Sequence, residues 1–199
     1  MGFRVVEKRE DLTEKKIISY RPTPNPEDIP VLNLRQIDKF ALSGGWISLK
    51  MKTLADLGFK AVLDLQFTPD DDINPRIVEK VTDAGMEYER ILFYDAEYNV
   101  DLEGIFEEGY EILDAWDKKY QEKDDKLLIK CGAGISRSVA MLCNYYCISR
   151  RMSYQEAADY IRSKKNPYDI SPQFGILYAF QKHLQTKFPD SSSAFGEKE

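Results

Sequence analysis

The chain has 199 residues, of which 43% are hydrophobic, enough to bury the core of a single domain. Its 28 Lys and Arg residues against 34 Asp and Glu give a net charge of −6, which argues against nucleic acid or an anionic membrane as a partner. The sequence shows neither the apolar core of a secretion signal nor an apolar run near the roughly 20 residues of a membrane-spanning helix, so we expect no membrane insertion and a cytoplasmic or nuclear location.

The two ends of the chain differ in composition from its middle. The first 35 residues are polar and charged, and their prolines at 22–30 exclude a helix or a central strand, so we expect an extended arm over 1–35. Regular hydrophobic patterning then predicts one domain over 36–187. Small polar residues predict a disordered tail over 188–199.

Short apolar runs alternate with helical patterns along the middle of the chain. The runs at 61–65, 88–93 and 127–129 predict buried strands. Apolar residues recur every three or four positions over 102–120, which predicts an amphipathic helix, and the nearly continuous apolar stretch 138–149 predicts a buried central helix. This alternation predicts the α/β class, with a central, mainly parallel, twisted sheet flanked by helices.

Two further helices are expected near the C-terminus. The sequence Ser153-Tyr154-Gln155-Glu156 has the form of a capping box and predicts a helix start. A last helix is expected after Pro172, where apolar residues again follow a helical period.

A glycine-rich loop joins the strand at 127–129 to the central helix. Such a loop directs backbone N–H groups and the positive end of the helix dipole into one concavity, which suits a phosphate dianion. Gly132 and Gly134 allow the backbone to curl, and Arg137 adds a planar fork for phosphate oxygens. The same dipole and guanidinium would lower the pKa of Cys131 and make its thiolate a nucleophile. The expected phosphate-binding residues are Gly132, Ala133, Gly134, Ile135, Ser136 and Arg137.

Metal and disulfide chemistry find little support in the sequence. The three cysteines, Cys131, Cys143 and Cys147, are an odd number within one short segment, which indicates reduced thiols, and the last two are best explained as buried small hydrophobes. One histidine, His183, cannot build a His-rich metal site. We therefore expect neither a metal nor another cofactor.

The run from Cys131 to Ser138 closely resembles the cysteine-dependent protein phosphatases, and its Ala-Gly-Ile-Ser-Arg-Ser portion is similar to their dual-specificity branch. The resemblance extends over about 36–187 and implies a protein tyrosine phosphatase-like fold. It also implies that Cys131 is the nucleophile, that Arg137 binds phosphate, and that the Ser138 hydroxyl stabilises the thiolate as a leaving group.

The leaving oxygen of a phosphate ester needs a proton, which a carboxylic acid on another loop would supply. Asp95 is the first choice, because it follows a predicted strand and so would reach the same sheet edge as Cys131. Glu97 and Asp101 on the same segment are the alternatives, although Asp101 is also a suitable cap for the helix at 102–120. In the second step the same carboxylate would activate water.

One residue departs from the family pattern. Lys130 precedes the cysteine where the family usually has histidine, and an ammonium there can lower the thiol pKa but cannot accept a hydrogen bond. The expected function is hydrolysis of phosphotyrosine and phosphoserine or phosphothreonine on proteins through a cysteinyl-phosphate. The alternatives are a weakly active or noncatalytic phosphoresidue-binding protein and a phosphatase of lipid or carbohydrate phosphates.

Overall fold

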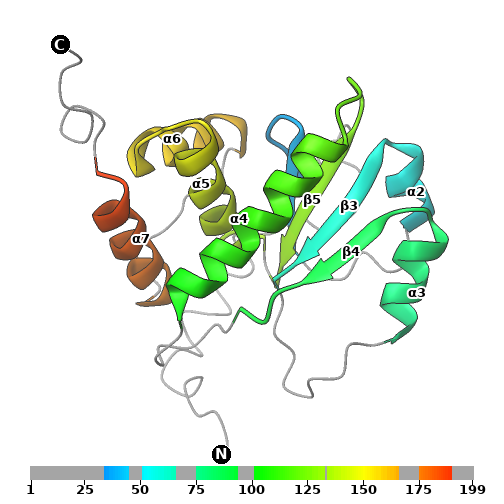
Figure 1. Ribbon diagram of the computed structural model, residues 1–199, viewed down its shortest axis with the longest axis horizontal. Coiled ribbons are helices and arrows are strands. Elements are labelled where there is room, and N and C mark those ends of the chain that lie inside the picture. The colour runs from blue at the N-terminus through cyan, green and yellow to red at the C-terminus, as the bar shows by residue number, and fades with distance from the viewer. Residues whose placement is uncertain are drawn as a thin grey trace, which may run out of the picture.

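The computed structural model describes residues 34–44, 51–65, 75–93, 101–132, 134–165 and 175–189 (Figure 1). Five strands form one sheet in the order β1-β2-β5-β3-β4. The strands β2, β5, β3 and β4 run parallel, and β1 pairs antiparallel with β2 at one edge. The strands are β1 (Arg35–Gln36), β2 (Phe40–Gly44), β3 (Phe59–Asp64), β4 (Glu87–Arg90) and β5 (Lys126–Cys131).

Helices cover both faces of this sheet. They are α2 (Met51–Asp56), α3 (Pro75–Asp83), α4 (Leu102–Lys119), α5 (Arg137–Ser149), α6 (Tyr154–Lys165) and α7 (Gly175–Lys187). In Figure 1, α2 and α3 lie on the right of the sheet, and α5, α6 and α7 lie on the left. This is the arrangement that parallel strands with crossover helices impose.

The alternating side chains of the strands divide the interior into two cores. On β5, Leu127, Ile129 and Cys131 join the larger core with α4, α5, α6 and α7, whereas Leu128 joins the smaller core with α2 and α3. Because every residue of β5 from Leu127 onward is buried, this strand lies in the centre of the fold. Side chains packed on both faces of the sheet therefore fix the position of the end of β5.

The predicted α/β architecture with a mainly parallel sheet is confirmed. The helix expected over 102–120 spans 102–119, and the central helix begins at Arg137, one residue before the expected start. The strand expected over 88–93 is shorter than predicted, since β4 covers only Glu87–Arg90. The sequence analysis missed β2, whose sequence Phe-Ala-Leu-Ser-Gly ends in residues that are poor strand formers.

The predicted arm over 1–35 and tail over 188–199 lie outside the described residues, apart from two positions at each inner end. Leu34 is buried in the smaller core, and Phe188 packs against the larger one. Among the helices that the structure describes, none is both long and apolar enough to span a membrane.

The capping box predicted before α6 is present. The Ser153 hydroxyl accepts a hydrogen bond from the Glu156 backbone N–H at 3.2 Å, and the Glu156 carboxylate accepts one from the Ser153 N–H at 2.7 Å. We expect Ser153→Ala to lower the free energy of unfolding by about 1 kcal/mol, measured by urea denaturation. Ser163→Ala, on the exposed end of the same helix, is the control, and an equal loss in both variants would contradict this role of the cap.

Candidate functional site

The candidate site lies where the parallel strands end. Cys131 is the last residue of β5, and α5 begins at Arg137, so the glycine-rich loop (residues 131–137) turns at the carboxyl edge of the sheet. Ligands of open α/β sheets bind at this edge, outside the carboxyl ends of the strands. Gly44, at the end of β2, pairs with Cys131 and closes the loop from one side.

The Cys131 thiol lies beneath the loop and is surrounded by donors. Its Sγ accepts a hydrogen bond from the Gly134 backbone N–H at 3.2 Å and lies 3.4 Å from the Ser138 hydroxyl. Burial raises the pKa of the thiol, but the positive charge of Arg137 and these hydrogen bonds outweigh burial. The pKa of Cys131 therefore lies below that of an ordinary cysteine.

This lowered pKa makes a testable prediction about the thiolate. A lower pKa means that the thiol loses its proton at lower pH, so we expect the midpoint of the Cys131 titration to lie below the ordinary value of about pH 8.5. The measurement is the ultraviolet absorbance of the thiolate between about pH 5 and 9, with the Cys131→Ser spectrum subtracted. A midpoint at or above the ordinary value would contradict the prediction.

The Arg137 guanidinium is fixed by the backbone of two other segments. Its Nη1 donates to the Leu65 carbonyl at 3.0 Å and to the Phe93 carbonyl at 2.9 Å, just beyond the ends of β3 and β4. The side chain is buried, and its Nη2 lies beside Gly132, where an added Cβ would be 3.0 Å away. The guanidinium thus lies over the start of the loop in one orientation.

Gly134 allows the loop to close against β2. Its φ of +70° is in the left-handed region, and an added Cβ would lie 2.5 Å from the Gly44 nitrogen and 2.8 Å from the Ser43 carbonyl oxygen. Any side chain here would be strained and would also push the loop away from the sheet.

We therefore expect Gly134→Ala to move the amide that now donates to Cys131. The predicted result is a thiol pKa raised toward the ordinary value and an unfolding free energy lower by about 1–3 kcal/mol. Thiolate titration and urea denaturation measure the two effects. Gly85→Ala is the control, because Gly85 also has positive φ but has open space around its Cα; equal thiol titration in both variants would contradict the role of Gly134.

The N-terminus of α5 faces the loop without a side-chain cap. Ser136 occupies the N-cap position but makes no side-chain hydrogen bond to the helix, and its buried hydroxyl has no hydrogen-bond partner among the described residues. The first N–H groups of a helix lack partners within that helix, and an anion can satisfy them. The loop can thus offer backbone amides, a hydroxyl and a guanidinium to a phosphate group.

The structure brings together most of the residues singled out in the sequence. Cys131, Gly134, Arg137 and Ser138 meet at the loop, and Gly132, Ile135 and Ser136 lie between them. Three other candidates, Ala133, Asp95 and Glu97, lie outside the described residues.

The alternative acid Asp101 has a structural task. Its carboxylate accepts a hydrogen bond from the Gly104 N–H at 2.9 Å and caps α4. The capping role considered for this residue is therefore confirmed.

Lys130 is on the other side of the sheet from Cys131. Its ammonium donates to the Asp64 carboxylate at 3.2 Å, and Tyr88 donates to the second oxygen of that carboxylate at 3.0 Å. From the sequence, Lys130 was expected to act only on the thiol, and its contacts with Asp64 and, through Asp64, Tyr88 were not predicted. The signal was present, because Asp64 is a carboxylate inside the apolar run 61–65.

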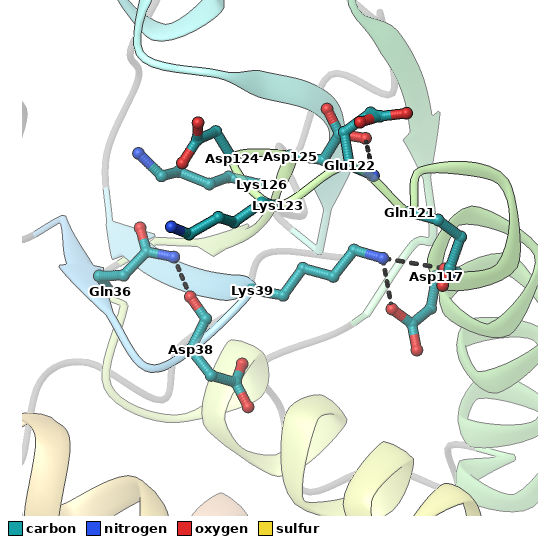
Figure 2. A pocket seen from close by; sticks show the side chains of 10 residues that line it. All are labelled: Gln36, Asp38, Lys39, Asp117, Gln121, Glu122, Lys123, Asp124, Asp125 and Lys126. Carbon is teal, nitrogen blue, oxygen red and sulfur yellow. Dashed lines mark hydrogen bonds and ion pairs between the residues drawn. The ribbon is translucent and has the colours of Figure 1, made fainter.

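The remaining cysteines and a surface hollow lie apart from this loop. Cys143 and Cys147 are buried free thiols, and burial raises the pKa of Cys147 to about 12. No group of three or more potential metal ligands occurs within the described ranges. The hollow has a volume of about 380 Å³. In Figure 2, Lys39 reaches Asp117 at this hollow, and Lys126, at the opposite end of β5 from Cys131, is one of the lining residues.

Comparison with known proteins relates this arrangement to one family. A family model described as dual specificity phosphatase, catalytic domain, matches residues 44–183. Dual specificity protein phosphatase 5 from Homo sapiens is 26% identical over 164 residues, which are 80% of this chain and 36% of that protein. Dual specificity protein phosphatase 9 from Homo sapiens is 30% identical over 141 residues, which are 69% of this chain and 33% of that protein.

Solved structures share the fold. The active form of Tk-PTP matches with a TM-score of 0.58 at 22% sequence identity, covering 78% of this chain and 98% of that chain. The chain thus spans only about a third of the two curated relatives but nearly all of a solved phosphatase structure. Since the family model matches well over half of the chain and includes the whole glycine-rich loop, the chain belongs to the dual specificity phosphatase catalytic domain family.

Proposed function

We propose that the chain hydrolyses phosphomonoesters on proteins, at both tyrosine and serine or threonine, through a cysteinyl-phosphate intermediate. The observation that carries this proposal is the environment of the Cys131 thiol. Its pKa is lowered, the Gly134 N–H donates a hydrogen bond to its sulfur, and backbone carbonyls hold the Arg137 guanidinium at the same loop. The family supports the same reaction, since relatives that share this domain are named dual specificity protein phosphatases.

The first step forms a bond between sulfur and phosphorus. The Cys131 thiolate attacks the phosphorus, the bond from phosphorus to the ester oxygen breaks, and Asp95 gives its proton to the departing alcohol or phenol. Arg137 and the loop amides stabilise the charge that spreads over the three phosphate oxygens. The Ser138 hydroxyl, 3.4 Å from Sγ, prepares the sulfur to leave in the next step.

The second step restores the enzyme. The Asp95 carboxylate takes a proton from water, the water oxygen attacks the phosphorus, and the bond between sulfur and phosphorus breaks. The electron pair of that bond returns to Cys131 as a thiolate, which the Ser138 hydroxyl and the Gly134 N–H stabilise. Inorganic phosphate then leaves.

Chain connectivity supports Asp95 as the acid. Phe93, whose carbonyl accepts a hydrogen bond from Arg137, already belongs to the site, and Asp95 follows it by two residues. Two residues extend at most about 7 Å, so this closeness along the chain favours Asp95 over carboxylates that are farther from Phe93 in the sequence. The alternative Asp101 is eight residues beyond Phe93 and already caps α4.

The composition of the loop supports a substrate with one phosphate. Between Cys131 and Arg137 the residues are Gly, Ala, Gly, Ile and Ser, and none carries a charge. A headgroup with several phosphates would need further cations at the loop to balance its charge. A phosphorylated protein side chain, which has one dianion, needs only the amides and Arg137.

The test is to trap the intermediate. The wild-type chain is mixed with an aryl phosphate, quenched in acid and digested, and the peptide containing Cys131 is examined for bound phosphate by mass spectrometry. A phosphorylated Cys131 and steady turnover are expected, whereas phosphate binding without either would favour the noncatalytic alternative. A panel of phosphotyrosine, phosphoserine and phosphothreonine peptides and of phosphoinositides then identifies the substrate class.

A further inference from the structure

Two fully buried charged side chains lie directly beneath the candidate site and take no part in the proposed chemistry. The Lys130 and Asp64 side chains are 1% and 0% exposed, and their charged atoms are 3.2 Å apart. Removing two such charges from water is unfavourable, and their attraction offsets this cost only in a favourable geometry. Stability alone is therefore a weak reason for a charged pair at this place.

The pair belongs to a row of polar residues that crosses the sheet. Lys130 on β5 has Ser43 of β2 as its neighbour on one side and Asp64 of β3 on the other, and Asp64 in turn has Arg90 of β4 beside it. Tyr88 of β4 donates to Asp64 at 3.0 Å and so connects β4 to the row by a side-chain hydrogen bond. The row thus links all four parallel strands just below their carboxyl ends.

On β2, β5 and β3, the residue after the row contacts or forms part of the glycine-rich loop. Cys131 follows Lys130 and carries the thiol, and Leu65 follows Asp64 and accepts the hydrogen bond from Arg137. The Leu65 N–H also donates to the Lys130 carbonyl at 2.8 Å. Gly134 rests on Ser43 and Gly44 at the end of β2. A change in the spacing of β5 and β3 would therefore move the thiol relative to the guanidinium.

We propose that Lys130, Asp64 and Tyr88 form a positioning network, which fixes Cys131 relative to the strand that anchors Arg137 and holds a cation on the opposite face of the same strand, within electrostatic range of the thiolate. This inference rests on the proposed function where kcat/KM is measured. The effect of the network on the thiol titration midpoint can be measured without any turnover. Among the described residues, the charged groups that act on the Lys130 ammonium include Asp64 on β3 and Cys131 and Arg137 at the loop. Tyr88 and Arg90 on β4 lie next to Asp64.

The charges around Lys130 also indicate that its ammonium favours the thiolate form of Cys131. Burial lowers the pKa of Lys130, and the nearby Asp64 carboxylate and the Cys131 thiolate both favour its charged form. The attraction is mutual, so the ammonium favours the thiolate. A cation one residue from the nucleophile thus adds to the effect of Arg137.

The decisive variant replaces both charges at once, as Lys130→Met with Asp64→Leu. Exchanging a buried ion pair for apolar residues of similar size is often neutral for stability, so we expect this double variant to fold. A modest fall in its unfolding temperature is expected, because the Tyr88 hydroxyl loses its acceptor on Asp64. We also expect its thiol midpoint to rise by about one pH unit and its kcat/KM to fall about tenfold at pH values well below the wild-type midpoint, because about tenfold fewer molecules carry the thiolate there. Each thiolate spectrum is measured against the same variant with Cys131→Ser.

Lys60→Met is the matched control, since Lys60 pairs with Asp125 near the other end of β3. It is expected to leave both the thiol midpoint and kcat/KM unchanged. If the double variant keeps the wild-type midpoint and kcat/KM, the pair is only a packing device and the inference is wrong. If the wild type shows no turnover but the double variant still has a raised thiol titration midpoint, the proposed function is wrong and the positioning network is supported.

If the double variant does not fold, two single variants of Lys130 test whether its charge affects the thiol. Lys130→Arg keeps the cation, and Lys130→Gln keeps a donor to Asp64 without the charge. We expect the arginine variant to retain a thiol midpoint near that of the wild type and the glutamine variant to raise it. Equal midpoints in these two variants would overturn the inference.

Discussion

Replacing Cys131 by serine is expected to abolish turnover of an aryl phosphate, with a loss of at least about 10⁴-fold in kcat, because the hydroxyl of serine is not ionised near neutral pH. The substitution removes one sulfur and keeps the size of the side chain nearly unchanged. Since Cys131 is buried beneath the loop and its Sγ accepts from Gly134, we expect the loop to persist around the serine. Steady-state kinetics between about pH 5 and 8 measures the loss.

The control for this prediction is Cys143→Ser. Cys143 is also a buried free thiol, but it lies within α5, and burial raises its pKa. This variant should lose some stability and keep the kcat of the remaining folded protein. Cys131→Ser should still bind phosphate or vanadate, because Arg137 and the loop amides remain. Turnover that survives in Cys131→Ser would show that another group is the nucleophile.

The chemistry of the loop was open to prediction because it is local. The thiol, the hydroxyl of Ser138 and the guanidinium of Arg137 all lie within eight consecutive residues. A strand before them and a helix after them are enough to turn these side chains toward one point. The buried strand could be predicted from the apolar run at 127–129, and the helix from the stretch at 138–149.

The contacts that hold Arg137 could not be predicted in the same way. Its acceptors are the carbonyls of Leu65 and Phe93, 72 and 44 residues away in the chain. Every residue has a backbone carbonyl, so no side-chain pattern indicates which two will meet the guanidinium. Only the order of the strands, β5 beside β3 and β3 beside β4, brings these positions together.

The position of Lys130 shows a different limit. Alternation along a strand already places neighbours on opposite faces, so Lys130 and Cys131 had to point apart. The partner of Lys130 required the pairing of β3 with β5, because Asp64 becomes its neighbour only through that register. Since β2 was also missed, the complete polar row beneath the loop emerged only from the structure.

Replacing Asp95 by asparagine is expected to lower kcat by about 10²- to 10³-fold for a phosphate ester with a poor leaving group, such as an alkyl alcohol, because the departing oxygen then receives no proton from the enzyme. A nitrophenolate leaves readily without a proton, so formation of the cysteinyl-phosphate from its ester should slow much less. Release of nitrophenol should then show a burst, since the same carboxylate is also missing when water attacks. Rapid mixing with the two kinds of ester separates these steps.

Asp101→Asn is the matched control for this test. Asn caps a helix about as well as Asp, so α4 should keep its N-terminal hydrogen bond to Gly104 and the variant should keep its kcat. If Asp101→Asn lowers kcat and Asp95→Asn does not, the acid has been assigned to the wrong carboxylate. The Asp95→Asn variant should differ from the wild type mainly for esters with poor leaving groups. If kcat depends on the leaving group equally in the wild type and in the variant, Asp95 is not the acid.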